Sequence, residues 1–362
     1  MLRQSAIRRC RWIALGFSAA VLFPGIAVGT CAPRLWSVAE VAGAREFAST
    51  LPSDLRNRIT HAAGKEATEM PAPLTRLASA GITQLDDTGL RASHRAFRDA
   101  DRVALLAVAW RLGGNQHWLA SARQTLLAWS AVNQPTGHPI DETRLDGFLW
   151  GYDLMRCALS LADRTAIEGW FARLRDAKRD WKFGPNTAIN NHRTHQLKML
   201  AALQALLEPE HLDDLRASVE RHARINLADA SGASMDFIER DALHYHVYNL
   251  EAWIEIALVT GCCAEPIAQS HAFMLKRMRE HGDAIEFERS RAAIDRERAK
   301  AGFRYAQPGP YDPKRAEGAL IAYATLQVRR GAAKSPIDAW SDARASSLLW
   351  RLARLHFWST SS

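Results

Sequence analysis

The helix that decides the fold of this chain is predicted to begin within the stretch Asn190-Asn191-His192-Arg193-Thr194-His195-Gln196-Leu197-Lys198-Met199-Leu200. Asparagine is a preferred N-cap residue, because its side-chain oxygen accepts a hydrogen bond from an otherwise unpaired backbone N–H of the first turn. The glycine and proline within residues 181–189 predict a loop before this helix. The stretch therefore places two amides and an imidazole at the positive end of a helix dipole, where an anion binds favourably.

On both sides of this stretch, apolar residues recur at helical spacing in segments that short loops separate. The predicted helices cover 35–63 with a break at Pro52, 99–112, 118–129, 145–161, 164–178, 190–200, 212–227, 248–260, 266–281, 316–330 and 339–357. Residues 64–92 predict a surface loop or lid, and residues 282–313, charged and containing Gly and Pro, predict a long surface excursion. No convincing run of alternating apolar and polar residues predicts a strand.

This succession of helices restricts the fold class. A helical bundle is one option, but a regular helix–loop–helix rhythm favours an α/α toroid, that is, an incomplete α/α barrel. Such a toroid gathers helix ends on one side, which suits a long polymeric ligand. We therefore predict an all-α fold with a single domain over residues 30–362.

Residues 1–29 have the pattern of a secretory signal peptide. A basic segment reaches Arg11, an apolar stretch runs from Trp12 to Val28, and Ala27-Val28-Gly29 offers a cleavage site. An uncleaved membrane anchor is the alternative, but the apolar stretch is short and is interrupted by Pro24. We expect a periplasmic or secreted mature protein without stable membrane insertion.

The charge of the chain limits the classes of partner. The formal net charge is +8, and removal of residues 1–29, which hold four arginines and no acid, lowers it to +4. This mild excess lacks the dense Lys and Arg runs of nucleic-acid-binding proteins, so we expect no nucleic acid partner. It suits an acidic polymer. The sequence does not define an oligomeric state.

Four cysteines follow the predicted signal: Cys31, Cys157, Cys262 and Cys263. Export permits disulfides, and the spacing is not that of a zinc site. At most one bridge is expected, with Cys31 joined to one of the others, and buried free thiols are the alternative.

A second polar cluster lies further along the chain, just before another predicted helix: Arg240-Asp241-Ala242-Leu243-His244-Tyr245-His246-Val247-Tyr248. An isolated Asn-His pair could merely cap a helix. Two clusters of amide, imidazole and phenol groups at two helix starts indicate a functional site instead.

The ordered pair of motifs resembles the alginate lyase domain family, which includes the poly-mannuronate lyases. That family pairs Asn-Asn-His with an Arg-Ala-Leu-x-Tyr-His-x-Tyr motif, and the resemblance covers roughly residues 90–330. The loop from Asn133 to Gly147, which includes Arg144, is also similar to the wider family. The resemblance implies an α/α toroid that cleaves an acidic polysaccharide by β-elimination without a cofactor.

Carried over residue by residue, the resemblance implies that Asn191, His192 and Tyr248 are catalytic. The arginine of the second motif falls on Asp241 here, and Arg240 lies one place earlier. Residues 193–195 are Arg-Thr-His, where poly-mannuronate lyases have Ser-Tyr-Trp, so the narrower substrate class does not transfer. Arg193, His195, His246 and Arg144 are candidates for binding or orienting sugar. Most tryptophans are expected to be buried in the core. Trp150 and Trp181, which are next to loops, are candidates for stacking on sugar rings.

These residue types suit the chemistry of elimination from a uronate. The carboxylate at C5 must be neutralised, a base must remove the C5 proton, and an acid must protonate the departing O4. Asn191 can donate a hydrogen bond to the carboxylate, and Arg240 or Arg193 can pair with it. His192 can serve as base or donor, and Tyr248 can serve as base and acid, with adjacent positive charge favouring the phenolate.

Three alternatives remain from the sequence. A metal site could use His192, His195, His244 and His246. A glycan hydrolase needs two opposed carboxylates, for which Asp141, Glu142, Asp146 and Asp153 are available. A non-catalytic glycan-binding or export-associated protein could share the fold, since the motif arginine is missing at position 241.

Overall fold

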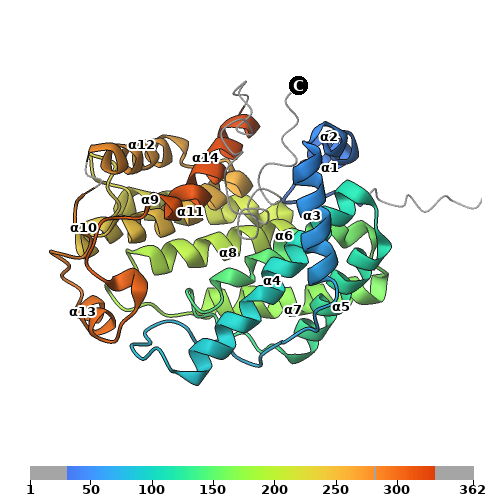
Figure 1. Cartoon of the computed structure of the whole chain (residues 1–362), viewed down its shortest axis with the longest axis horizontal. Coiled ribbons are helices and arrows are strands. Elements are labelled where there is room, and N and C mark those ends of the chain that lie inside the picture. Colours follow the sequence, from blue (N-terminus) through green and yellow to red (C-terminus); the bar gives the residue numbers. More distant parts are fainter. Residues whose placement is uncertain (1–30, 281–282, 331–362) are drawn as a thin grey trace, which may run out of the picture. The chain divides into compact units, whose positions relative to one another are not determined.

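The computed structural model describes residues 31–280 and 283–330 (Figure 1). Within these ranges the chain forms helices and no strand, apart from one isolated antiparallel bridge between Ile285 and Pro310. The prediction of an all-α fold is confirmed.

Five helices pack in succession and form an inner layer. Each contacts the next one named: α4 (Thr88–Gly113), α6 (Asp146–Met155), α8 (Asn191–Leu207), α11 (Leu243–Thr260) and α14 (Glu317–Arg329). Helix α6 is buried along its whole length, and α8 and α11 are buried over most of theirs. Figure 1 shows α4, α6, α8 and α11 following one another across the molecule.

A second set of helices lies against the inner layer. Helices α3 (Ser53–Glu66) and α5 (Gln116–Val132) pack on α4, α7 (Leu161–Asp180) and α9 (Leu212–Asn226) pack on α8, and α12 (Ala264–Glu280) packs on α11. An amphipathic helix buries its apolar stripe on the inner layer and exposes its polar face, as α9 does. This pairing of inner and outer helices is the α/α toroid that the helical rhythm predicts.

The remaining elements are short. They comprise α1 (Val38–Ala42), α2 (Ala44–Thr50), α10 (Met235–Arg240), α13 (Ala293–Lys300) and the 3-10 turns Thr143–Leu145, Arg156–Ala158, Pro209–His211, Arg304–Ala306 and Pro313–Ala316. The loop between α3 and α4 covers residues 67–87 and is shorter than the predicted 64–92, because α4 begins at Thr88, with Asp87 as its N-cap, rather than at 99.

Two glycines let the backbones of α4 and α6 approach closely. A Cβ atom added at Gly147 would lie 2.5 Å from the carbonyl oxygen of Ala100, and one at Gly151 would lie 2.9 Å from Val103 Cγ1. Dense packing of this kind leaves no room for an added methyl group. The contact fixes α6 in the centre of the fold.

Substitution of Gly147 by alanine is expected to lower the free energy of unfolding by about 1–3 kcal/mol, because the helices must separate to admit the methyl group. Gly169→Ala, in α7, is the matched control: nothing lies within 4 Å of its added Cβ. That change should stabilise the helix by about 0.5–1 kcal/mol. Denaturant unfolding of both variants measures the difference, and equal effects would contradict the close approach of α4 and α6.

Two further helix starts and one predicted loop also differ from prediction. Helix α11 begins at Leu243 rather than 248, because its cap is remote: Glu286 Oε1 accepts a hydrogen bond from the backbone N–H of His244 (2.8 Å). Helix α7 begins at Leu161 rather than at 164, since Ser160 is its N-cap. The predicted surface excursion 282–313 contains the helix α13.

The disulfides also differ from expectation. Cys262 is joined to Cys263, and Cys31 and Cys157 are also disulfide-bonded, so the expectation of at most one bridge is wrong. The turn between α11 and α12, in which Gly261 and Cys263 both have positive φ, brings the two adjacent thiols together.

Two predicted segments lie outside the described residues: the signal peptide at 1–29 and the helix at 339–357. Among the residues that the structure describes, no helix combines the length and apolar character needed to cross a membrane.

Candidate active site

The start of α8 is held by two acceptors from different parts of the chain. The side chain of Asn190 accepts a hydrogen bond from the N–H of His192 (3.0 Å), as predicted for an N-cap. Asp236 Oδ1 accepts from the N–H of Asn191 (2.9 Å), and Asn226 Nδ2 donates to Asp236 Oδ2 (3.2 Å). Burial raises the pKa of Asp236 to about 6. Because these groups cap the helix, the side-chain amide of Asn191 is not needed for capping.

His192 is a neutral imidazole at neutral pH. Burial, together with the nearby His138 and Arg240, lowers its pKa to about 4, and Asp141 opposes this shift only in part. A neutral ring can accept a proton or donate one N–H bond. His192 therefore has the protonation state that a general base requires.

His138 lies beside His192 and was not among the predicted site residues. The two ring centroids are 5.9 Å apart, and the His138 ring also contacts Trp181 at 4.7 Å. His138 Nδ1 lies 3.2 Å from both the backbone nitrogen and Oδ2 of Asp141, which fixes the orientation of the ring. A signal was present in the sequence, since His138 stands in the Gly- and Pro-containing loop similar to the family.

A buried ion pair supports the loop that carries His138. Lys178 Nζ lies 3.1 Å from Glu142 Oε2 and donates to the carbonyl oxygen of His138 (2.7 Å). Glu142 in turn accepts from the N–H groups of Thr136 and Gly137. Lys178 is 0% and Glu142 2% exposed, so both charges depend on this contact.

Tyr248 lies on α11 against His195 of α8. Their ring centroids are 4.1 Å apart, and His195 Nδ1 lies 2.7 Å from Thr143 Oγ1. Burial raises the pKa of Tyr248, and the positive charge of Arg144 opposes this rise only in part. The expectation that adjacent charge favours the phenolate is therefore wrong. The phenol carries its proton at neutral pH.

Arg240 lies in the same region but is already paired. Its Nε donates to Asp295 Oδ2 (2.8 Å) and its Nη2 to Asp295 Oδ1, and Nη2 also donates to the hydroxyl of Tyr245 (2.9 Å). The guanidinium stacks on the Tyr245 ring, with Cζ 3.8 Å from the centroid. Arg298 of α13 donates to the same hydroxyl (3.4 Å). Arg298 and Asp295 lie in the segment predicted to be a surface excursion, and neither was among the predicted site residues.

Two predicted sugar-binding residues are in the core instead. Trp150 is 1% exposed and packs edge-on against Trp36, because α6 is buried on all sides. His246 is 0% exposed, with Nδ1 bonded to Ser234 and Nε2 to the carbonyl oxygen of Ser270. Neither side chain can stack on or contact a sugar in this structure. Trp181, beside His138, is only partly buried.

Three other candidates occupy different surroundings. His195 is 2% exposed and lies behind Tyr248 rather than at the surface, with its Nε2 buried and without a partner. Arg144 forms an ion pair with Asp101 (2.8 Å) and lies within electrostatic range of Tyr248. Arg193 lines a separate cavity of about 520 Å³ beside α7, α8 and α9 and stacks on Phe183. The structure does not bring Arg193 to the other site residues.

The four carboxylates that a hydrolase could use all take part in hydrogen bonds or ion pairs within the fold. Asp141 accepts from the N–H groups of Ser79 and Ala80. Asp146 pairs with Lys198 (2.6 Å), and Glu142 pairs with Lys178. Asp153 accepts from the backbone N–H groups of residues 34–36. No two of these carboxylates are left as an opposed catalytic pair.

The histidines of the metal alternative do not assemble into a ligand set. Both ring nitrogens of His246 are already bonded, and no group of three His, Cys, Asp or Glu side chains within 31–280 and 283–330 has the arrangement to hold a metal ion. The arrangement that does form is a neutral imidazole, a protonated phenol and two guanidinium groups.

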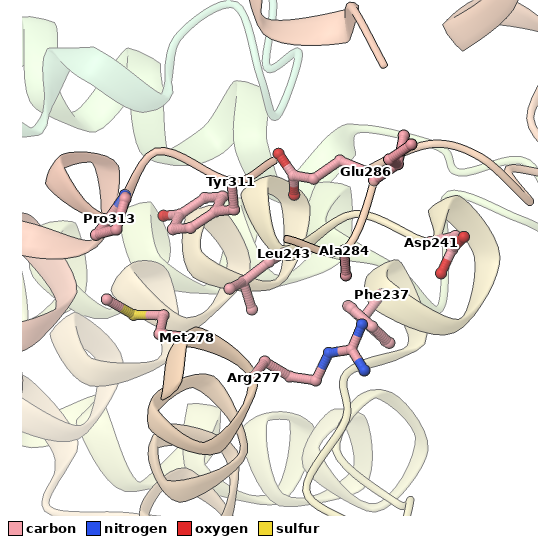
Figure 2. A pocket seen from close by; sticks show the side chains of 10 residues that line it. Phe237, Asp241, Leu243, Arg277, Met278, Ala284, Glu286, Tyr311 and Pro313 are labelled. Carbon is pink, nitrogen blue, oxygen red and sulfur yellow. The ribbon is translucent and has the colours of Figure 1, made fainter. Parts of the chain in front are cut away.

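A small pocket lies beside this region, at the N-terminus of α11. Figure 2 shows Glu286 and Tyr311 along one side, Arg277 and Met278 along the other, and Asp241 at its end. Burial raises the pKa of Glu286 to about 7. The pocket encloses about 30 Å³, which gives room for water but not for a sugar ring. It does not hold His192 or Tyr248.

Comparison with known proteins places this arrangement in context. The family model described as alginate lyase matches residues 56–261. An alginate lyase from Bacteroides ovatus has a similar structure, with a TM-score of 0.63 at 12% identity, over 91% of this chain and 99% of that one. Alginate lyase A1-III from Sphingomonas species A1 gives a TM-score of 0.54 at 15% identity, over 66% and 76% of the two chains.

A histidine-to-alanine variant of alginate lyase A1-III, complexed with tetrasaccharide, is also similar, with a TM-score of 0.55 at 15% identity over 80% of this chain and 86% of that one. No curated protein matches the sequence significantly. At these identities the structures show a shared fold, and the family model covers more than half of the chain.

Proposed function

The chain belongs to the alginate lyase family and is a polysaccharide lyase, and from this premise we propose that it cleaves an acidic, uronate-containing polysaccharide of the alginate or poly-mannuronate type by β-elimination. One observation carries the proposal: α8 and α11 pack together and present a neutral His192 and a protonated Tyr248 in one region. The tetrasaccharide bound to a protein of the same fold supports a glycan as the partner. The predicted signal at 1–29 supports a periplasmic or secreted location.

The protonation states suggest which group gives and which takes a proton. His192, neutral because burial lowers its pKa, removes the proton at C5. The electron pair of that C–H bond forms the C4–C5 double bond, and the C4–O4 bond breaks. Tyr248, protonated because burial raises its pKa, donates its proton to the departing O4. The products are a new non-reducing end with an unsaturated uronate and a new free hydroxyl on the leaving chain.

The remaining side chains act on the carboxylate of the reacting sugar. Removal of the C5 proton places negative charge on this carboxylate, and preorganised donors stabilise it. The amide of Asn191, released from helix capping, donates a hydrogen bond to it. Arg240 adds positive charge to the region, although Asp295 compensates most of that charge.

The proposed reaction is tested by absorbance near 235 nm, where an unsaturated uronate is expected to absorb. The mature protein is incubated with poly-mannuronate, poly-guluronate, glucuronan and hyaluronan-like polymers. A rise on one polymer is the expected result and identifies the substrate. New reducing ends without absorbance would indicate hydrolysis, and binding without either product would indicate a non-catalytic glycan-binding protein.

The pH dependence of the reaction follows from His192. Its neutral form is the base, and its pKa is lowered to about 4, so kcat/KM should persist at pH 5 and fall only as the pH approaches 4. An unperturbed histidine would lose activity below a pH of about 6.5. Initial rates between pH 4 and 8 measure the pH at which kcat/KM falls to half, and circular dichroism at each pH confirms that the protein is folded. A midpoint at pH 6–7 would contradict the role of His192 as a buried base.

A further inference from the structure

The position that holds an arginine in the second motif carries an acid in this chain. Asp241 ends α10 in a left-handed conformation (φ 48°). Its carboxylate accepts from the backbone N–H of Arg289 (3.0 Å) and lies 3.7 Å from the exposed guanidinium of the same residue. The carboxylate at position 241 is therefore already bound to Arg289 and cannot neutralise an anion. The carboxylate of a bound uronate needs a cation from another residue.

The adjacent arginine does not fill this role, because its charge is compensated. Asp295 binds Arg240 through both carboxylate oxygens, and its own side chain is 1% exposed. A bidentate pair of this kind is among the strongest ionic contacts in proteins. A substrate carboxylate would have to displace Asp295 and leave its buried carboxylate without its cation, with only the hydroxyl of Ser290 (2.6 Å) still donating to it, which is unfavourable.

Arg298, one turn after Asp295 on α13, has a guanidinium without an acidic partner. Its Nε donates to the carbonyl oxygen of Ile82 (3.0 Å) and its Nη1 to the hydroxyl of Tyr245 (3.4 Å), and no ion pair joins it to a carboxylate of the described residues. The Ile82 and Tyr245 bonds hold the guanidinium in place from two elements distant in sequence. Arg298 thus presents a fixed, uncompensated positive charge.

The position of this charge matches the proposed reaction. Tyr245 and Tyr248 are three residues apart on α11, so their side chains lie on the same face of that helix. The charge of Arg298 also acts on His192. In Figure 1, α13 and the orange segments beside it lie next to the loop that precedes α4, which is where the Ile82 bond forms. Arg298 accordingly bonds to a residue on the same face of α11 as Tyr248, and its charge reaches His192.

We propose that Arg298 binds the carboxylate of the reacting uronate and replaces the arginine that the second motif lacks at position 241. The inference rests on the proposed lyase function. A guanidinium whose charge is not compensated by a neighbouring acid, in a site with little water, stabilises the charge that develops when the C5 proton leaves. Its fixed hydrogen bonds mean that little reorganisation is needed during the reaction.

The test compares Arg298→Met with Arg296→Gln on the same helix. Arg296 is exposed and bonds only to the carbonyl oxygen of Ser290 (3.3 Å), so it is the matched control. We expect Arg298→Met to lower kcat/KM on the acidic polymer about 10²–10³-fold, as loss of one charge-stabilising donor does. Arg296→Gln should retain the wild-type value.

A second substrate separates a role in carboxylate binding from a role in structure. The methyl ester of the same polymer lacks the charge that Arg298 would bind, so the wild-type preference for acid over ester should fall at least tenfold in Arg298→Met. Arg298→Lys should recover part of this preference, because it restores a positive charge. Equal losses on acid and ester, or a variant within threefold of wild type on both, would overturn the assignment.

Failure of the inference is distinguishable from failure of the proposed function. If the wild-type protein forms no unsaturated product from any uronate polymer, the proposed function fails and the inference fails with it. If the wild type forms that product and Arg298→Met keeps its preference for the acid, only the role of Arg298 is wrong. Circular dichroism and thermal unfolding confirm that each variant folds, and Arg298→Lys provides the charged variant should Arg298→Met unfold.

Discussion

Replacement of Tyr248 by phenylalanine is expected to lower the turnover number about 10²–10⁴-fold, the usual contribution of a positioned general acid. The phenol is protonated, because burial raises its pKa, and the phenylalanine ring cannot donate to O4. The ring contact with His195 can persist, so KM and the melting temperature should change little. Initial rates at 235 nm and circular dichroism measure these quantities.

Tyr323→Phe is the matched control for this variant. Tyr323 lies on α14 and stacks on His271, with ring centroids 3.8 Å apart, away from the residues named as catalytic. Its loss of a hydroxyl should leave turnover unchanged. Near-wild-type turnover in Tyr248→Phe would show that another group protonates the leaving oxygen.

Substitution of Lys178 by methionine is expected to lower the free energy of unfolding by about 3–5 kcal/mol, since it leaves the buried carboxylate of Glu142 without its cation. The carbonyl oxygen of His138 loses its donor at the same time, so turnover should also fall. Urea unfolding and initial rates, measured on the same preparation, report the two effects.

Two further variants test the origin of this loss. The double variant Lys178→Met, Glu142→Gln removes the stranded charge and should recover part of the stability. Lys276→Met is the exposed control, since Lys276 is 64% exposed and pairs only loosely with Glu280 (3.9 Å). It should change the free energy of unfolding by no more than about 0.5 kcal/mol. A similarly small effect at Lys178 would refute its supporting role.

The toroid could be predicted because its signals are local. Apolar residues at helical spacing define each helix, and the start of α8 was placed correctly because its cap, Asn190, adjoins it. The start of α11 was misplaced because its acceptor, Glu286, is remote in sequence and lies beyond α12. A cap that depends on the tertiary fold leaves no pattern in the neighbouring residues.

The candidate site was predicted only where a motif covers it. Asn191, His192 and Tyr248 stand in such motifs, on the helices α8 and α11, which pack together, and the Tyr248 ring contacts His195, one turn after His192. Trp150 was misassigned because Gly147 and Gly151 let α4 cover α6, which the proximity of a loop does not reveal. His138 and Arg298 acquire their positions through remote contacts. The burial of the Tyr248 side chain is also invisible in the sequence. This burial raises the pKa of the phenol, so the side chain is protonated where a phenolate was expected.

The bond between Arg298 and Ile82 has a consequence for the order in which the protein matures during its synthesis. The two residues are 216 positions apart, and the segment of the chain that matches the family ends at residue 261, before Arg298. At translation rates of about 5–20 residues per second, roughly 10–40 s separate the emergence of the two partners. By the end of this interval the chain of helices α4 to α11 has been synthesised. The constellation of charges around Tyr245 needs α13, which follows them, and the inner layer is complete only with α14, which comes later still, so the site and the toroid are both finished by the last part of the described chain.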